Sequence, residues 1–154
     1  MTAPPGDGGI DCGATCSASY ESGMEVTLTA TPASGSIFTG WSGGCSGTGT
    51  CTVTMNSDTV VTATFDLQTF TLSVNKTGIG SGTVTSGDGG IDCGPTCAAS
   101  YTSGTVVTLT ATPAFGSIFT HWRGCDMVSH RTCTVTMSAA RSVTARFLGI
   151  PPLF

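Results

Sequence analysis

Residues 8–43 read GGIDCGATCSASYESGMEVTLTATPASGSIFTGWSG, and residues 89–124 read GGIDCGPTCAASYTSGTVVTLTATPAFGSIFTHWRG. The two stretches are identical at 28 of 36 positions, at an offset of 81 residues. The correspondence continues through CTVTM at residues 51–55 and 133–137, and it closes on VTATF and VTARF. Self-similarity at a fixed period is the signature of a repeat architecture. The sequence therefore predicts two copies of one unit.

Within each copy, apolar residues alternate with threonine. Val26, Leu28 and Ala30 are separated by Thr27 and Thr29, which gives one buried and one exposed face of a strand. Helix-forming residues are scarce, whereas the chain has 29 threonines. We therefore expect an all-β protein. The strands predicted for the first copy lie at 26–30, 37–41, 53–55 and 61–65, with a short one at Ser17–Tyr20, and the second copy repeats them.

The two copies are not equally complete. The second is preceded by TFTLSVNKTGIGSGTVTS, residues 69–86, in which an alternating segment and a glycine-rich turn have the pattern of a β-hairpin. The first is preceded only by MTAPPGD. The predicted organisation is a truncated first domain at 1–65, a complete second domain at 69–147, and an apolar tail, LGIPPLF, at 148–154.

Composition excludes several classes of protein. The chain of 154 residues has five Lys+Arg, nine Asp+Glu and a formal net charge of −4. Five scattered cations do not form the basic face that a nucleic-acid partner requires. With 39% hydrophobic residues the chain is also unlike a disordered one. It has no run of about 20 apolar residues, so no membrane insertion is expected.

Each copy contains four cysteines. An even number in a small β unit indicates disulfides formed in an oxidising compartment, because a thin core needs covalent support. Zinc is the competing interpretation, but the spacings do not match those of a finger or ribbon. Three disulfide connectivities per copy remain open. We favour local pairs, because the segment 45–51 lengthens to 125–133 without a change in its flanks. The favoured pairs are Cys12–Cys16, Cys45–Cys51, Cys93–Cys97 and Cys125–Cys133.

The string GTVTS…GIDCG-x-TC-x-ASY…G-x-x-VTLTATP…GS-x-FTGWSG-x-C…CTVTM…VTATF resembles the divergent internalin-type B-repeat family. The resemblance covers the chain apart from MTAPP at its start and LGIPPLF at its end. It implies small β-grasp-like sheets and a non-catalytic spacer, adhesion or assembly role in secreted and surface proteins of bacteria. It supplies no catalytic residue, and the sequence departs from the family pattern in the short first copy and in the loop 126–131.

Candidate chemistry is sparse. The only histidines are His121 and His130, and a catalytic triad would need one of them held by a third group in a cleft. Together with Arg123, Asp126 and Arg131 they are interpreted as a solvated polar loop. The pairs Asp7/Asp11 and Asp88/Asp92 lie in G-D-G-G-I-D turns, where aspartate caps backbone amides more readily than it binds calcium. We expect no catalytic residue, metal or cofactor.

Aromatic residues raise the alternative of a carbohydrate-binding or adhesion module, with a surface glycan as partner. Trp41, Tyr20 and Phe38 recur in the second copy, where they would serve equally well as core residues. Buried indoles would favour a structural role, and an exposed coplanar pair would favour sugar. Thr-x-Thr steps such as Thr27/Thr29 also suggest ice binding, but any sheet with threonine on its wet face shows them.

The short first copy leads to the functional hypothesis. A β unit without two of its strands leaves an open edge and an apolar groove, and both are templates for another strand. Three explanations stay open: the chain is a slice of a longer array, the first copy tolerates the loss, or a neighbouring molecule completes it. The third predicts self-association into an oligomer or fibre. The tail would contribute to assembly by hydrophobic docking through Leu148, Ile150, Leu153 and Phe154, since Pro151 and Pro152 cannot donate ladder hydrogen bonds.

The sequence thus predicts a non-enzymatic structural protein that is secreted or on the cell surface. Its role would be that of a stalk, a spacer or a fibre subunit, although the chain contains no signal sequence.

Overall fold

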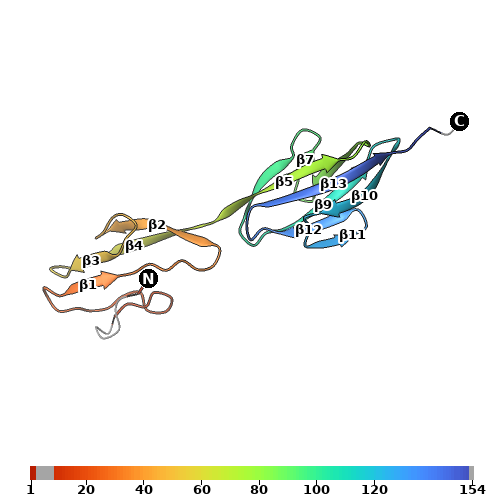
Figure 1. Cartoon of the computed structure of the whole chain (residues 1–154). Coiled ribbons are helices and arrows are strands. Elements are labelled where there is room, and N and C mark those ends of the chain that lie inside the picture. The colour runs from red at the N-terminus through yellow and green to blue at the C-terminus, as the bar shows by residue number, and fades with distance from the viewer. Residues whose placement is uncertain (3–8, 153–154) are drawn as a thin grey trace. The chain divides into compact units, whose positions relative to one another are not determined.

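The computed structural model describes residues 1–2 and 9–152, and these residues form strands and turns without a helix. The predicted all-β class is therefore confirmed. Within the described residues there is consequently no helix that could cross a membrane. The chain divides into two compact units, Met1–Leu67 and Gln68–Phe154 (Figure 1).

The first unit has four described strands arranged as two antiparallel pairs. Strand β1 pairs with β3, and β2 pairs with β4. Their core is small and consists of the buried side chains of Val26, Leu28, Trp41 and Cys51. The strand bounds are β1 Glu25–Leu28, β2 Ser36–Gly43, β3 Cys51–Thr54 and β4 Val61–Leu67.

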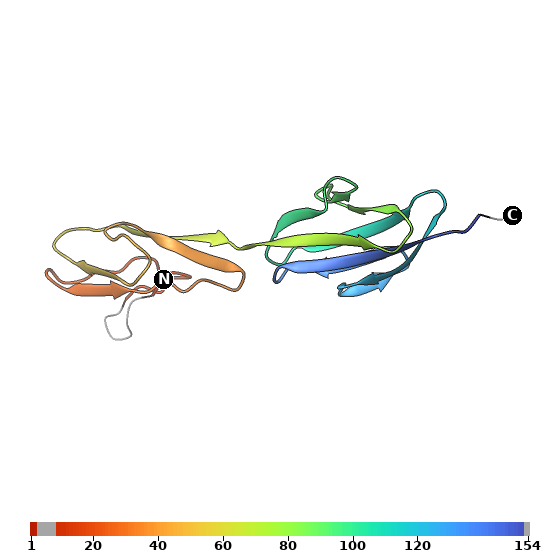
Figure 2. The ribbon, with the colours of Figure 1, turned by 45° about the horizontal axis from the view of Figure 1, so that its top comes forward.

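The second unit has nine strands in two sheets, of order β10-β13-β5-β8 and β11-β12-β9-β6-β7. All neighbours are antiparallel except β5 and β13, which run parallel and side by side (Figures 1 and 2). The bounds are β5 Thr69–Thr77, β6 Gly82–Ser86, β7 Asp92–Cys93, β8 Ala98–Thr102, β9 Val106–Pro113, β10 Ser117–Arg123, β11 Met127–Ser129, β12 Thr132–Thr136 and β13 Arg141–Gly149.

Both sheets of the second unit contribute to one core. Leu72 on β5 and Phe147 on β13 come from the four-stranded sheet, and Val84, Leu109 and Val135 come from the five-stranded one. All five side chains are buried. Alternation of apolar and threonine residues along β9 places one face on this core and the other toward solvent, as the period-two pattern predicts.

The prediction of a β-hairpin at residues 69–86 is wrong, because its two strands, β5 and β6, belong to different sheets. The intervening glycines carry the chain from one sheet to the other, across Phe147 and Leu148 of β13. A Cβ atom on Gly80 would collide with the Leu148 backbone, and one on Gly82 with the Phe147 ring. Alternation identifies a strand, but it does not identify the strand's partner. Here two strands close in sequence pair with distant segments instead of with each other.

The strand expected at Ser17–Tyr20 is also wrong, although its counterpart in the second unit, β8, is a strand. The reason lies in the pairing partner: β8 pairs only with β5, and the described residues of the first unit include no counterpart of β5. Strand β1 is likewise four residues long where β9 is eight, since the additional half of β9 pairs with β6. The same sequence pattern thus gives less strand where the neighbouring strand is missing.

This difference predicts faster amide hydrogen exchange at Ser17–Tyr20 than at Ala98–Tyr101. Amides without a ladder partner open at little free-energy cost, whereas ladder amides next to a core are protected. Hydrogen exchange followed by NMR measures both segments in one sample, and the paired Val26–Leu28 serves as a protected reference. Equal protection of the two segments would contradict the proposed cause.

Substitution of the equivalent phenylalanines predicts a second contrast. Phe147 is 1% exposed and Phe65 is 39% exposed. Phe147→Ala should lower the free energy of unfolding of its unit by about 3–5 kcal/mol, because it leaves a cavity. Phe65→Ala should cost only about 1 kcal/mol, because less apolar surface is lost. Urea unfolding measures both losses, followed by the indole N–H signals of Trp41 in the first unit and Trp122 in the second. A larger loss of stability for Phe65→Ala than for Phe147→Ala would contradict the difference in burial.

Candidate functional site

The eight cysteines form four disulfides between near neighbours in the sequence, and none remains free in the described chain. Two of them close short turns, with Cα–Cα distances of 4.3 Å for Cys12–Cys16 and 4.4 Å for Cys93–Cys97. The other two close longer loops, at 5.7 Å for Cys45–Cys51 and 5.6 Å for Cys125–Cys133. The structure thus brings together the local pairs favoured from the sequence.

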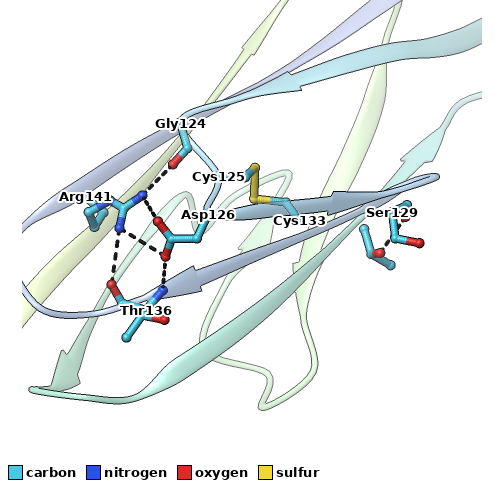
Figure 3. The surroundings of a disulfide bond; sticks show 8 residues. Gly124, Cys125, Asp126, Ser129, Cys133, Thr136 and Arg141 are labelled. Atoms are coloured by element: carbon cyan, nitrogen blue, oxygen red, sulfur yellow. Dashed lines mark hydrogen bonds and ion pairs between the residues drawn. A yellow bond between two sulfur atoms is a disulfide. The ribbon is translucent and has the colours of Figure 1, made fainter.

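An ion pair joins the loop closed by Cys125–Cys133 to Arg141 at the start of β13 (Figure 3). Arg141 Nη2 lies 2.8 Å from Asp126 Oδ1, and the same nitrogen donates to the Gly124 carbonyl at 2.9 Å. The Thr136 amide donates to Asp126 Oδ2 at 2.7 Å. Hydrogen bonding from Arg141, followed by that from Thr136, lowers the pKa of Asp126. Sequence reasoning did not single out Arg141, since nothing in the sequence shows that a residue 15 positions away faces Asp126.

The second polar cluster belongs to a turn. Asp88 Oδ1 accepts hydrogen bonds from Ser86 Oγ at 2.5 Å, from the Gly90 amide at 2.9 Å and from Tyr101 Oη at 3.2 Å. These bonds, that from Ser86 first, lower the pKa of Asp88. Burial raises the pKa of Tyr101. The carboxylate therefore caps a backbone amide, as expected for this turn; Asp7, its counterpart, lies outside the described residues.

The structure does not assemble the histidines into a site. His121 Nδ1 lies 3.3 Å from the hydroxyl of Thr120, and His130 occupies a left-handed position, with a φ of 57°, at the turn between β11 and β12. In the described chain, no hydrogen bond or ion pair joins any two members of the predicted polar loop, and no three metal-binding side chains gather. The members of that loop are His121, Arg123, Asp126, His130 and Arg131.

Both tryptophans are core residues. Trp41 and Trp122 are each 6% exposed. Trp41 packs edge-on against Phe38, with ring centroids 5.2 Å apart, and its Nε1 donates to the Gly49 carbonyl at 2.7 Å. Neither indole offers an exposed ring face for a sugar. By the criterion set from the sequence, burial favours a structural role for these aromatic residues.

The most distinctive feature is an apolar groove in the first unit. Its cavity volume is 220 Å³, and its walls carry no charged side chain. Met1 and Tyr20 line it beside core residues of β1 and side chains of β3 and β4. The lining residues are Met1, Ile10, Cys16, Ser17, Ala18, Tyr20, Val26, Leu28, Val53, Met55, Thr59, Val60 and Val61. We call this feature the first-unit groove.

The second unit shows what covers the equivalent surface. Ile91, Met137 and Val143 correspond to Ile10, Met55 and Val61, and all three are fully buried in one core with Leu72 and Val74 of β5. Their first-unit counterparts line the groove and are only partly buried. The first-unit groove is therefore the surface that β5 would cover.

Backbone edges border the groove on both sides. Among the described residues, β4 pairs only with β2, whereas its counterpart β13 pairs with both β10 and β5. The segment Ser17–Tyr20 pairs with no strand. The N-terminal dipeptide replaces part of β6, because Thr2 bridges Thr29 and Asp11 as Thr85 bridges Thr110 and Asp92. The place of β6 is thus partly filled, and no residue that the structure describes occupies the place of β5.

The C-terminal assembly residues are only partly described. Leu148 lies within β13 and is partly buried. Ile150 is 54% exposed, and its amide donates to the Gly116 carbonyl at 2.7 Å. Leu153 and Phe154 lie outside the described residues. The assembly role of the tail therefore remains a prediction.

Comparison with known proteins identifies one family. The model of the divergent InlB B-repeat domain matches residues 1–69 and 71–151, which is one match for each copy. No curated protein is significantly similar to the chain, and no solved structure is.

The two carboxylates with lowered pKa values predict acid sensitivity of the second unit. Their ordinary value is 3.8, so the stability they contribute is present above about pH 4 and is lost as pH falls through the lower folded-state value. The melting temperature of this unit should therefore decrease when the pH is lowered below about 4. The double variant Asp88→Asn/Asp126→Asn should flatten that dependence, as measured by NMR-monitored melting. An unchanged pH profile in the double variant would assign acid sensitivity to other groups.

The disulfides predict a simple peptide map. Digestion of the non-reduced chain should release Cys12 linked to Cys16 and Cys125 linked to Cys133, with the other two local pairs. Mass spectrometry identifies them. A peptide that links Cys16 to Cys45 would contradict the local pairing.

Proposed function

Since the chain belongs to the divergent InlB B-repeat family, we propose that it is a non-enzymatic extracellular structural protein. It is a bacterial surface repeat module of two units. In this proposal the units act as a stalk or spacer, or as fibre subunits joined by strand or tail complementation. The observation that carries the proposal is the first-unit groove with its two unpaired backbone edges.

The disulfides support an extracellular location. Four disulfides in 154 residues persist only in an oxidising compartment, because cytosolic reductants keep thiols reduced. The cores they support are small, above all in the first unit, where four side chains form the buried cluster. Small domains with thin cores are the usual setting of structural disulfides in secreted proteins.

The polar groups support a structural role over a catalytic one. Asp88 caps a turn, and Asp126 holds a loop through Arg141. Both carboxylates already accept several hydrogen bonds, Asp88 within its turn and from Tyr101, and Asp126 from Thr136 and Arg141, so each has a stabilising task. Families of repeat domains of this type are not typically enzymatic.

The exposed strand edges support assembly. Soluble proteins usually protect an open edge with lysine or inward-pointing charge. The chain has one lysine, Lys76, which lies in the second unit and donates to the Gly82 carbonyl. The first-unit groove has no charged side chain. An edge without such protection is suited to pairing with a strand from another polypeptide.

The proposal predicts concentration-dependent self-association of the disulfide-intact chain. Light scattering coupled to size-exclusion chromatography, together with electron microscopy, measures it over a range from micromolar to millimolar protein. A monodisperse monomer throughout would contradict assembly and would leave the spacer role.

Truncation after Gly149 separates the role of the tail from that of the groove. It leaves β13 complete and removes Ile150 and the residues after it. If the tail docks hydrophobically, the apparent association constant should fall at least about tenfold, the effect of one lost apolar anchor. Ile150→Ser in the full chain serves as a milder comparison. An unchanged assembly in electron micrographs would exclude the tail from the contact.

A further inference from the structure

We propose that the first-unit groove is a receptor for one extended strand of β5 type, bound where β5 lies in the second unit. The occupant is an otherwise unpaired segment from outside residues 1–154, with apolar residues at alternate positions and no proline. This inference rests on one part of the proposed function, the groove that accepts a strand, and it specifies which strand the groove accepts. It is argued from the second unit, in which the same surface is covered.

One wall of the groove sets the direction of the strand. In the second unit β5 runs parallel to β13, with Leu72 opposite Arg141 and Val74 opposite Val143. Because Arg141 and Val143 correspond to Thr59 and Val61, the bound strand would run parallel to β4. Strand β4 begins at Val61, two residues later than its counterpart β13, and those two additional residues of β13 pair only with β5. The missing start of β4 is therefore the part that an added strand would order.

The opposite wall sets the register. Strand β5 runs antiparallel to β8, with Phe70 opposite Tyr101 and Leu72 opposite Ala99. The counterparts of these two β8 residues, Tyr20 and Ala18, both line the first-unit groove. A bound strand would therefore place its Phe70-like residue opposite Tyr20 and its Leu72-like residue opposite Ala18.

The floor of the groove sets the side chains. In the second unit Leu72 is 0% exposed and Val74 is 4% exposed, and both lie in one core with Ile91 and Met137. The equivalent floor positions, Ile10 and Met55, are apolar and partly open in the first unit. Two apolar side chains two positions apart would reach this floor, because alternate residues of a strand point to the same face. A charged side chain at either position would be moved from water onto an apolar floor, which is costly because none of the lining side chains is charged.

The hydrogen bonding excludes two candidate occupants. A strand between two neighbours needs its amides on both edges, and proline supplies none. The tail, with Pro151 and Pro152, therefore does not fit as this central strand. The β5 strand of a second folded copy does not fit either, because it is already buried in its own unit and its removal would open the same surface there. An unpaired extended segment from outside residues 1–154 remains.

The test uses a synthetic peptide with the sequence of residues 69–77, TFTLSVNKT, labelled at its N-terminus and added to the full, disulfide-intact chain. Fluorescence anisotropy should show saturable binding of one peptide per chain. A peptide with Leu72→Asp and Val74→Asp should bind at least about tenfold more weakly, because it would bury charge in an apolar floor. Absence of binding, or equal binding of the two peptides, would overturn the proposal.

A completed chain is the matched control. In it, Met1–Asp7 is replaced by residues 69–88 of the same sequence, so that the first unit has its own β5 and β6 and keeps the turn aspartate. This chain should not bind the peptide. In the unaltered chain, bound peptide should increase amide protection at Ser17–Tyr20 and Thr59–Val61, with the second unit unchanged. Undiminished binding by the completed chain, or protection gained only in the second unit, would place the peptide elsewhere and overturn the proposal.

Failure of the peptide-binding test can be distinguished from failure of the self-association test. If the chain binds the peptide in this way but stays monomeric, the strand receptor stands and self-assembly is wrong. If the chain assembles but neither binds the peptide nor is affected by it, assembly uses another surface and the strand receptor is wrong.

Discussion

The double pairing of β5 is the interaction on which the complete unit depends. This strand joins β13 on one side and β8 on the other, and it buries Leu72 and Val74 between them. Where β5 is present, 16 buried residues form one core shared by two sheets. In the first unit, where the described residues provide neither β5 nor most of β6, the core cluster has four buried residues, Ser17–Tyr20 is not a strand, and β4 starts late. The two units of one chain therefore form an internal comparison of one sequence pattern with and without β5 and most of β6.

Sequence alone was sufficient for the repeat, the all-β class and most strands, because these depend on local alternation and self-similarity. It misjudged two elements whose state depends on a distant partner. Phe70–Val74 and Gly82–Thr85 are strands, but they lie in different sheets, since the glycines at 80 and 82 lie directly on β13. Ser17–Tyr20 has the pattern of a strand without a strand to pair with. The groove could be predicted from the short first copy. The register and direction of a strand bound in it could be inferred only from the pairing of β5 with β13 and β8 in the structure.

The remaining polar and covalent features have local tasks. The disulfides close turns and loops within each unit, and the Asp126–Arg141 pair holds the one loop that differs most between the copies. Thr59 takes the place of Arg141 in the first unit, so this pair has no equivalent there. What distinguishes the first unit functionally is an apolar surface with free backbone edges on either side. In the proposal, such a surface would bind an extended strand through backbone hydrogen bonds and alternate side chains.

The most direct measurement of strand replacement is a set of intermolecular NOEs between the isotope-labelled chain and the bound peptide TFTLSVNKT. Placement in the first-unit groove predicts NOEs from the peptide's Leu72 to Ala18 and from its Val74 to Val61, consistent with a strand parallel to β4 and antiparallel to Ser17–Tyr20. NOEs only to residues of the second unit, or a register in which the apolar side chains face solvent, would contradict it.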